Sequence, residues 1–493
     1  MLSQEKEVSE EVLPQKGEHL LSHQISAWTQ DPGSGNQPNG GQLIQLNAPK
    51  LSSKPLPTII HGQAPSAKVY PPGTAGFRYW NTASALRRGS DYWGKLLPGI
   101  TWQMGKTLPI DLDFGVDLNA YYDRVGLKFF HATVAGRTVF SCESPDVVCH
   151  EQGHAVLDAI KPQLWDAASI EAGAFHESFG DISSILCALQ LQSLRIAVLG
   201  ETEGNLYRSS RLSRMAEQLG WAIRQDFPTA VDADCLRNAV NSFFYRDPNT
   251  IPSSGPANTL SSEPHSFSRV FTGAFFEGLA GMFKLRTDQD EENLLQVSLD
   301  MGKILVTAIR NAAVVPAFFS QIAVNMIQAA NLQFVSINYG QALRSAFVRH
   351  GILSPATTTI TSITEPRSMA DGNENDATEL PKMNLSVKEY DLGVDEIVVH
   401  AAIATSRFEV AGAALSMGSL DMPSHEDTAK SFVEDLLRRG RLKIDSITNK
   451  KNRGMAITRP NAPDTHETYT HELREENGSV ILRRIRIDCG FTC

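Results

Sequence analysis

Residues 147–160, VVCHEQGHAVLDAI, contain two histidines four positions apart, with a glutamate directly after the first. Because an α-helix turns once per 3.6 residues, His150 and His154 would project from one face of a helix. Two imidazoles in this arrangement can share a zinc ion while Glu151 reaches a water bound to that ion. Zinc catalysis also requires a third protein ligand and an open position for the water, so the fold must bring another donor to this helix.

The third ligand is predicted on a second helix. In metzincins it is a histidine six residues further on, but that position holds Ile160 here. The later segment EAGAFHESFGDISSIL provides Glu177, with Asp181 one turn on along the same helical face. Glu177 could complete the zinc shell, and Asp181 could accept the free ring N–H of His150 and thereby fix its tautomer. The alternative is an acidic pair on a solvated helix face.

Composition divides the chain, which at 493 residues is too long for one ordinary core. Residues 1–64 are polar and are expected to form a flexible tail or a short precursor. Residues 65–353 have mixed strand and helix patterns at first and helical patterns afterwards. Residues 354–384, rich in Thr, Ser, Pro and Asn, are expected to be a linker. Residues 385–493 mix strand-like pieces with one amphipathic helix and predict a small C-terminal α+β domain of unknown role.

Hydrophobic periodicity predicts the individual elements. Helices are expected in NTASALRRGSDYWGKLL, SFSRVFTGAFFEGLAGMF, ENLLQVSLDMGKILVTAIRNAA, PAFFSQIAVNMIQAANL, YGQALRSAFVRHGIL and SHEDTAKSFVEDLLRRG. Strands are expected in LPIDLDFGVD, GRTVFSCES, EIVVHAAIA and ETYTHELREENGSVILRRIRI. Ser424 is expected to cap the last helix, with Asp427 three residues on.

Charge and composition also bear on partners and location. A formal net charge of −10 argues against nucleic-acid binding by the whole chain. The six cysteines are too few and scattered for a disulfide framework and are interpreted as reduced thiols. The N-terminus lacks the features of a secretory signal, and the most apolar window is interrupted by Arg310, Asn311 and Pro316. We therefore expect no membrane association, and either a cytoplasmic location or export without a recognisable signal peptide.

A basic cluster in the C-terminal domain leaves two interpretations open. It consists of LLRRGRLK, NKKNRG and ILRRIRI. These residues could bind an anionic partner, or they could form a solvated surface, which is the commoner outcome for such runs.

Five segments taken together resemble the thermolysin-like zinc metallopeptidases, or gluzincins, in the order that this family has them. The resemblance covers roughly residues 70–353, and the order of the segments is far more specific than the histidine motif alone. The segments are NAYYD (from Asn119), VVCHEQGHAV, EAGAFHESFGD, LRNAVNSFFYRDP (residues 236–248) and EPHSFS (residues 263–268).

The resemblance implies an α+β catalytic domain with a β-rich N-terminal lobe and a helical C-terminal lobe, joined here to a small α/β C-terminal domain. It implies one catalytic Zn²⁺ bound by His150, His154 and Glu177. It also implies a role for each of the other site residues. Glu151 is the general base, His265 the second catalytic histidine, Asp181 the partner of a zinc ligand, and Asn119, Ala120 and Arg237 bind the substrate.

Four departures from the family pattern affect these expectations. The family usually has a tyrosine nine residues before its third ligand, and this position is Ala168 here. Loss of one oxyanion donor can lower the rate by about 10²–10³, unless Tyr121, Trp165 or another residue substitutes. Structural Ca²⁺ sites are not evident. The long secreted-type propeptide is also absent, so leaderless members are the closer analogue, and the C-terminal hundred residues have no counterpart that we recognise.

The leading hypothesis is therefore a zinc-dependent endopeptidase that hydrolyses peptide bonds in a peptide or protein substrate. The alternative is a catalytically impaired metallopeptidase-like protein with a binding or scaffold role. The sequence does not indicate the substrate preference or the oligomeric state.

Overall fold

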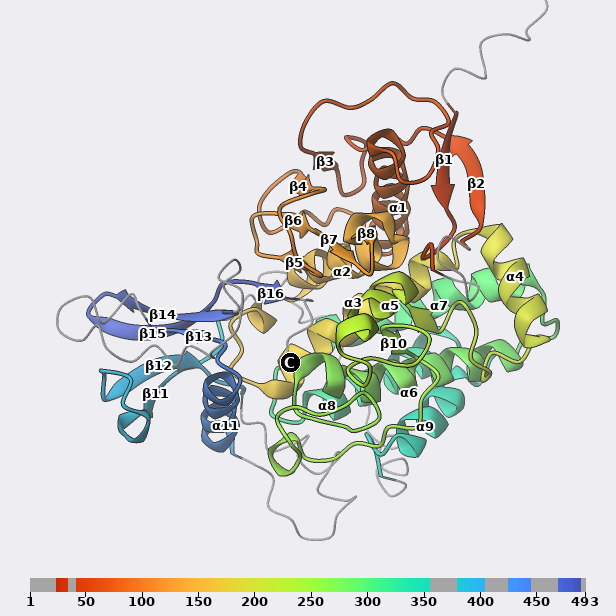
Figure 1. Cartoon of the computed structure of the whole chain (residues 1–493). Coiled ribbons are helices and arrows are strands. Elements are labelled where there is room, and N and C mark those ends of the chain that lie inside the picture. The colour runs from red at the N-terminus through yellow and green to blue at the C-terminus, as the bar shows by residue number, and fades with distance from the viewer. Residues whose placement is uncertain (1–23, 34–40, 355–378, 404–423, 445–468, 489–493) are drawn as a thin grey trace, which may run out of the picture.

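The computed structural model describes residues 24–33, 41–354, 379–403, 424–444 and 469–488 (Figure 1). These ranges form a mixture of helices and strands, so the predicted α+β class is confirmed. The sequence NKKNRG, the residues Cys489 and Cys493, and most of the expected linker lie outside the described residues.

A five-stranded sheet lies in the N-terminal part of the molecule, with the order β16-β5-β6-β4-β3. Strands β3, β4 and β6 run parallel, whereas β5 is antiparallel to β6 and β16 is antiparallel to β5. Helix α1 (Ala75–Leu96) packs beside this sheet, and Thr74 caps its first turn. The strands are β3 (Thr58–Ile60), β4 (Leu108–Asp111), β5 (Ala120–Tyr122), β6 (Leu127–Phe129) and β16 (Ile487–Asp488).

Two hairpins accompany the sheet, β1 (Gln24–Trp28) with β2 (Leu43–Asn47) and β7 (His131–Val134) with β8 (Arg137–Phe140). Strand β1 is largely buried. Its Trp28 donates a backbone N–H to Asn81 of α1 at 2.9 Å, and its ring lies 5.6 Å from that of Phe77. The expectation of a flexible tail over residues 1–64 is therefore wrong for residues 24–33 and 41–64. The short apolar strand is hidden in the sequence by the polar composition around it.

A group of helices forms the largest part of the core, and the helices predicted there are confirmed. Phe271 of α6 joins this core, since its ring lies 5.2 Å from both Phe175 of α3 and Phe319 of α8. The helices are α2 (Pro145–Ile160), α3 (Ile170–Ala188), α4 (Gln192–Thr202), α5 (Glu217–Asp226), α6 (Pro264–Lys284), α7 (Glu291–Asn311), α8 (Phe318–Gln333) and α9 (Tyr339–Arg349). A short ladder joins β9 (Arg214–Met215) to β10 (Arg237–Asn238).

The C-terminal unit contains a second five-stranded sheet, with the order β11-β12-β15-β14-β13, and helix α11 (His425–Arg438) packs against it. The predicted cap is confirmed, because Ser424 and Asp427 form a reciprocal capping box. The unit begins at Lys382, inside the range expected to be linker. Its strands are β11 (Lys382–Ser386), β12 (Glu396–His400), β13 (Leu442–Lys443), β14 (His471–Glu476) and β15 (Ser479–Arg484).

Within the described ranges, no single helix has the length and apolar composition of a membrane span. Helices α3 and α4 reach these values only together, and they bend by 101° at their junction.

Candidate metal centre

Helix α2 positions the two histidines and the glutamate of the HEQGH motif. The Ser144 side chain caps its first turn, and Pro145 occupies its first position, where a missing N–H costs nothing. His150, Glu151 and His154 are all buried, and one donor atom from each lies within 4.8 Å of the others. The rings of His150 and His154 are 4.7 Å apart between centroids. This group could hold a metal ion.

Helix α3 brings Glu177 to both imidazoles. One carboxylate oxygen of Glu177 lies 3.4 Å from Nε2 of His150, and the other lies 3.9 Å from Nε2 of His154. Tetrahedral zinc takes nitrogen and oxygen ligands at about 2.0–2.2 Å. Two ligand atoms of one such ion then lie about as far apart as these nitrogen–oxygen distances of 3.4 and 3.9 Å. Glu177 is therefore close enough to both imidazoles to be a candidate ligand beside them.

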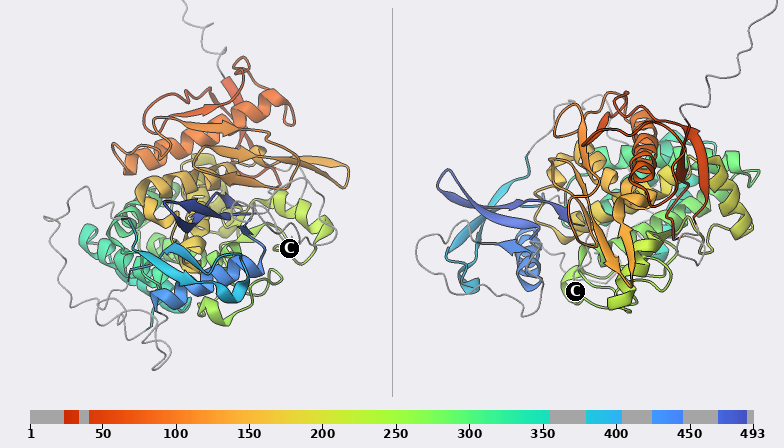
Figure 2. Two further views of the ribbon diagram at one scale, coloured as in Figure 1. Left: turned by 90° about the vertical axis from the view of Figure 1, so that its left-hand side faces the viewer. Right: turned by 45° about the horizontal axis from the view of Figure 1, so that its top comes forward.

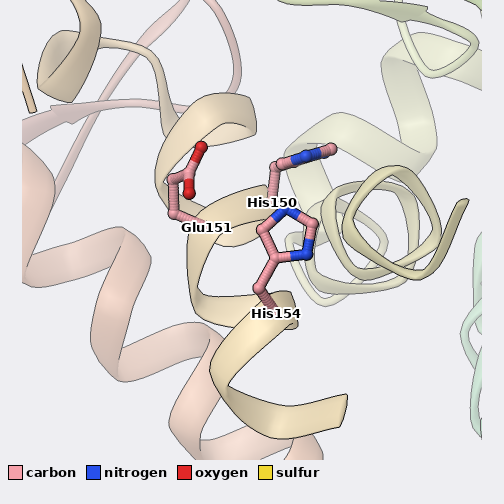
Figure 3. Close-up of side chains that lie close together, drawn as sticks. All are labelled: His150, Glu151 and His154. Carbon is pink, nitrogen blue, oxygen red and sulfur yellow. The ribbon is translucent and has the colours of Figure 1, made fainter. Parts of the chain in front are cut away.

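Glu151 and Glu177 both offer a carboxylate near these histidines. In Figure 3 His150, Glu151 and His154 leave the same stretch of α2, and one carboxylate oxygen of Glu151 lies within 4.8 Å of a ring nitrogen of each histidine. Glu177 also approaches both rings, so the two imidazoles have two carboxylates near them.

Asp181, one turn after Glu177, binds the outer nitrogen of His150. Its Oδ1 lies 3.0 Å from Nδ1 of His150. Arg237, which is buried on β10, donates to both carboxylate oxygens, at 2.7 and 3.1 Å. Although burial opposes ionisation, Arg237 and His150 together lower the pKa of Asp181 to about 2. Asp181 faces Nδ1 of His150 and leaves Nε2 as the nitrogen that a metal would take. Although burial opposes protonation, Asp181 and Glu177 raise the pKa of His150 to about 9, so a metal would have to displace a proton.

His265, near the start of α6, also contacts the carboxylate of Glu177. Its Nε2 lies 3.1 Å from Glu177, and its Nδ1 lies 2.7 Å from Glu263. Burial opposes protonation of this ring, but the charges of Glu177 and Glu263 raise its pKa to about 10. Glu263 also caps α6 by accepting the N–H of Ser266 at 2.9 Å. His265 is therefore joined to the site by its contact with Glu177, in addition to its place at the start of α6.

Ala120 of β5 lines a small cavity together with His150, Glu151 and Arg237, and much of the remaining lining is apolar. Asn119 is buried just before this strand, and its side chain donates to Asp117 at 3.3 Å. The other residues that line the cavity are Asp146, Val147, Asp181, Ser184, Met215, Ala216, Leu219 and Leu236.

Ala168 contacts the C-terminal unit. So do Trp165 and Tyr121, the two aromatic residues that could act as oxyanion donors in place of the tyrosine that position 168 lacks. The backbone N–H of Ala168 donates to His400 at 2.9 Å, and its side chain joins the core of that unit. The indole N–H of Trp165 donates to the carbonyl of Arg484 at 3.2 Å. The guanidinium of Arg486 lies 5.0 Å from the centroid of the Tyr121 ring.

Sequence reasoning missed Glu263 and Arg484 as neighbours of this site. An acid two residues before a histidine at a helix start was a usable signal for Glu263. No local signal exists for Arg484, because its contacts here are with residues some 300 positions earlier.

Comparison of this sequence with protein-family models gave no match, and a search of curated proteins also gave none. The assignment of a function therefore depends on the residues of the site themselves.

Proposed function

We propose that this chain is a zinc-dependent endopeptidase of the thermolysin-like type. The observation that carries the proposal is the approach of the two Nε2 atoms of α2 to the two carboxylate oxygens of Glu177 on α3, at 3.4 and 3.9 Å. This donor set, two imidazoles and one carboxylate, is one that catalytic zinc sites use. His150, His154 and Glu177 would hold the ion.

A bound zinc ion supplies a water of lowered pKa and polarises a carbonyl oxygen. The chain's own contribution to proton transfer is Glu151, the buried carboxylate next to His150. Glu151 would accept a proton from the attacking water and pass it to the leaving nitrogen of the peptide bond.

Two cationic side chains are available to stabilise the negative charge that develops on the substrate carbonyl oxygen. His265 is one of them, since the charges of Glu177 and Glu263 raise its pKa against the effect of burial. Arg237 is held in place by its two hydrogen bonds to Asp181 and lines the cavity next to Glu151. His265 and Arg237 would together provide this stabilisation.

The substrate would bind as an extended strand along β5. Asn119 and Ala120 lie at the end of β5 that is next to the cavity. Val147, Met215, Leu219 and Leu236 give this cavity an apolar wall.

The second candidate function is a metal-binding scaffold without catalysis. It is favoured by Ala168, because this position carries no oxyanion donor and is packed into the C-terminal unit instead. Measurement of zinc content alone does not separate the two functions, since both bind the ion.

Hydrolysis of a quenched fluorescent peptide by the full chain separates them. We expect hydrolysis that a chelator abolishes and zinc restores. Glu151→Gln should retain zinc and lose about 10²–10⁴ of the rate, because it removes the proton acceptor but none of the proposed ligands. Full activity of Glu151→Gln, or hydrolysis that survives complete removal of the metal, would contradict the proposal.

A further inference from the structure

The C-terminal strand β16 occupies the edge of β5. Ile487 pairs with Tyr122 and Asp488 pairs with Tyr121, in antiparallel register. The other edge of β5 is paired with β6. At Tyr121 and Tyr122, strand β5 therefore has no edge left for an added peptide, although an extended substrate that continues past Ala120 would need one.

Side-chain contacts anchor this strand. Ile487 is only 2% exposed and belongs to the main core. Asp488 is buried and lies 3.4 Å from Arg441 and 3.1 Å from Arg486. The buried side chain of Ile487 joins β16 to the main core, and the two ion pairs of Asp488 tie the same strand to the C-terminal unit.

Arg484, three residues before β16, enters between α3 and the start of α6. Its Nε donates to the carbonyl of Trp165 at 2.6 Å. Its Nη2 lies 3.9 Å from the position that a Cβ on Gly173 would take, and Pro264 is equally close to that position. Gly173 is one turn before Glu177, and Pro264 precedes His265. The guanidinium is therefore inserted on the His265 side of the proposed zinc site.

Further contacts fix the same unit to segments that flank the site. Ser262 donates to Asp435 of α11 at 3.0 Å, and Asp435 is ion-paired with Arg439 at 2.6 Å. Asp166 lies 3.2 Å from Arg483. In the left view of Figure 2 the blue C-terminal elements lie in front of the boundary between the orange strands and the green helices.

From these contacts we infer that the C-terminal unit is a built-in inhibitor of the proposed peptidase. Strand β16 would exclude a substrate strand at Tyr121 and Tyr122, because β16 and a peptide cannot pair with the same edge of β5. The inference rests on the proposed function, since it assigns the regulation of that site. It also gives the arginines of ILRRIRI a role other than the two expected from the sequence, because they contact the peptidase part of the chain.

The test measures peptide binding by the full-length, zinc-loaded Glu151→Gln protein, which should not hydrolyse its ligand. The probe is a fluorescent peptide hydroxamate with an extended apolar segment, and its Kd is measured by anisotropy. Ile487→Ala weakens β16 and should lower the Kd about tenfold or more, because burial of this side chain is lost. Arg484→Met, which keeps an aliphatic chain but removes the guanidinium, should also lower the Kd.

Val480→Ala is the matched control. Val480 lies in β15 and packs against the core of the C-terminal unit, away from β5. Its Kd should equal that of the parent protein. An unchanged or higher Kd for Ile487→Ala, or no binding to any variant, would overturn the inference. If Ile487→Ala does not fold, as judged by thermal melting, the Kd of Arg484→Met decides in the same way.

The same substitutions in the protein with Glu151 intact distinguish this inference from the proposed function. Hydrolysis of the quenched peptide should rise with Ile487→Ala by about the factor found for binding. Equal rates of hydrolysis by Ile487→Ala and by the parent protein would contradict the inhibitory role of the C-terminal unit but support the peptidase function. Tighter hydroxamate binding without any hydrolysis would contradict the peptidase function but support the conclusion that β16 blocks the edge of β5.

Discussion

At the scale of single residues, the proposed metal site would depend also on side chains that are not among the proposed ligands. Asp181 contacts Nδ1 of His150 at 3.0 Å and is held by two hydrogen bonds from Arg237. Such a partner fixes the orientation and the tautomer of a histidine ligand. The affinity for zinc should therefore depend on Asp181 as well as on the ligands.

We predict that Asp181→Asn weakens zinc binding by about 10–100-fold, because the amide orients His150 less well and carries no charge. Competition with a chromogenic chelator measures the Kd for zinc. Asp158→Asn is the control, because Asp158 is also a buried acid with two hydrogen bonds from an arginine, here Arg124. Equal zinc affinity of Asp181→Asn and Asp158→Asn would contradict the role of Asp181.

At the scale of elements, the site depends on the close packing of α2 against α3. Gly180 makes the approach possible, since a Cβ there would lie 2.6–2.7 Å from three ring atoms of His150. On the opposite helix, a Cβ on Gly153 would lie 2.8 Å from Cβ of Ser183. Contacts this short require something to move, so both glycines are needed for the distance between the helices.

We predict that Gly180→Ala displaces the ring of His150 and raises the Kd for zinc about tenfold or more. The overpacking should also cost about 1–3 kcal/mol of stability. Gly173→Ala in the same helix is the control, because the nearest side-chain atoms there are 3.9 Å away. It should bind zinc like the wild type. A Gly180→Ala protein with wild-type affinity would show that the glycine does not set the position of His150.

The first turn of α3 contains a second buried acid, Glu171. It accepts the hydroxyl of Tyr245 at 2.6 Å and the backbone N–H of Phe319 at 2.8 Å. Burial outweighs these hydrogen bonds and raises the pKa of Glu171 from 4.5 to about 7. Between these pH values the folded state binds more protons than the unfolded state, so stability falls as the pH rises.

We predict that Glu171→Gln removes this contribution, which amounts to about 3 kcal/mol over the whole pH window. Between pH 4.5 and 7.5 the Tm of the wild type should fall by more than the Tm of Glu171→Gln. Differential scanning calorimetry at several pH values measures both. Parallel curves for the two proteins would show that Glu171 titrates alike in the folded and unfolded chains.

At the scale of the whole molecule, local sequence patterns predicted the features that depend on residues close together in the sequence, namely helices and a helix cap. The periodic apolar runs predicted the long helices, and the capping pair Ser424 and Asp427 was found as expected. The spacing of His150 and His154 predicted one shared face of α2. Placement of Glu177 beside them required the order of several segments and not the motif alone.

Long-range pairing was not predictable in the same way. Strand β1 was missed because its five residues lie in a polar stretch, and its burial comes from α1. Strand β16 has only two residues, and nothing in them indicates a partner as distant as Tyr121 and Tyr122. Arg484 was attributed to a basic surface, whereas tertiary contacts hold it beside α3.

An anomalous difference map at the zinc absorption edge, from crystals of the full chain grown with zinc, would test the proposed zinc centre without any assay of activity. We predict one peak at about 2.0–2.2 Å from Nε2 of His150, Nε2 of His154 and a carboxylate oxygen of Glu177. A peak that Glu177 does not contact, or no peak between α2 and α3, would contradict a catalytic zinc ion held by these three side chains.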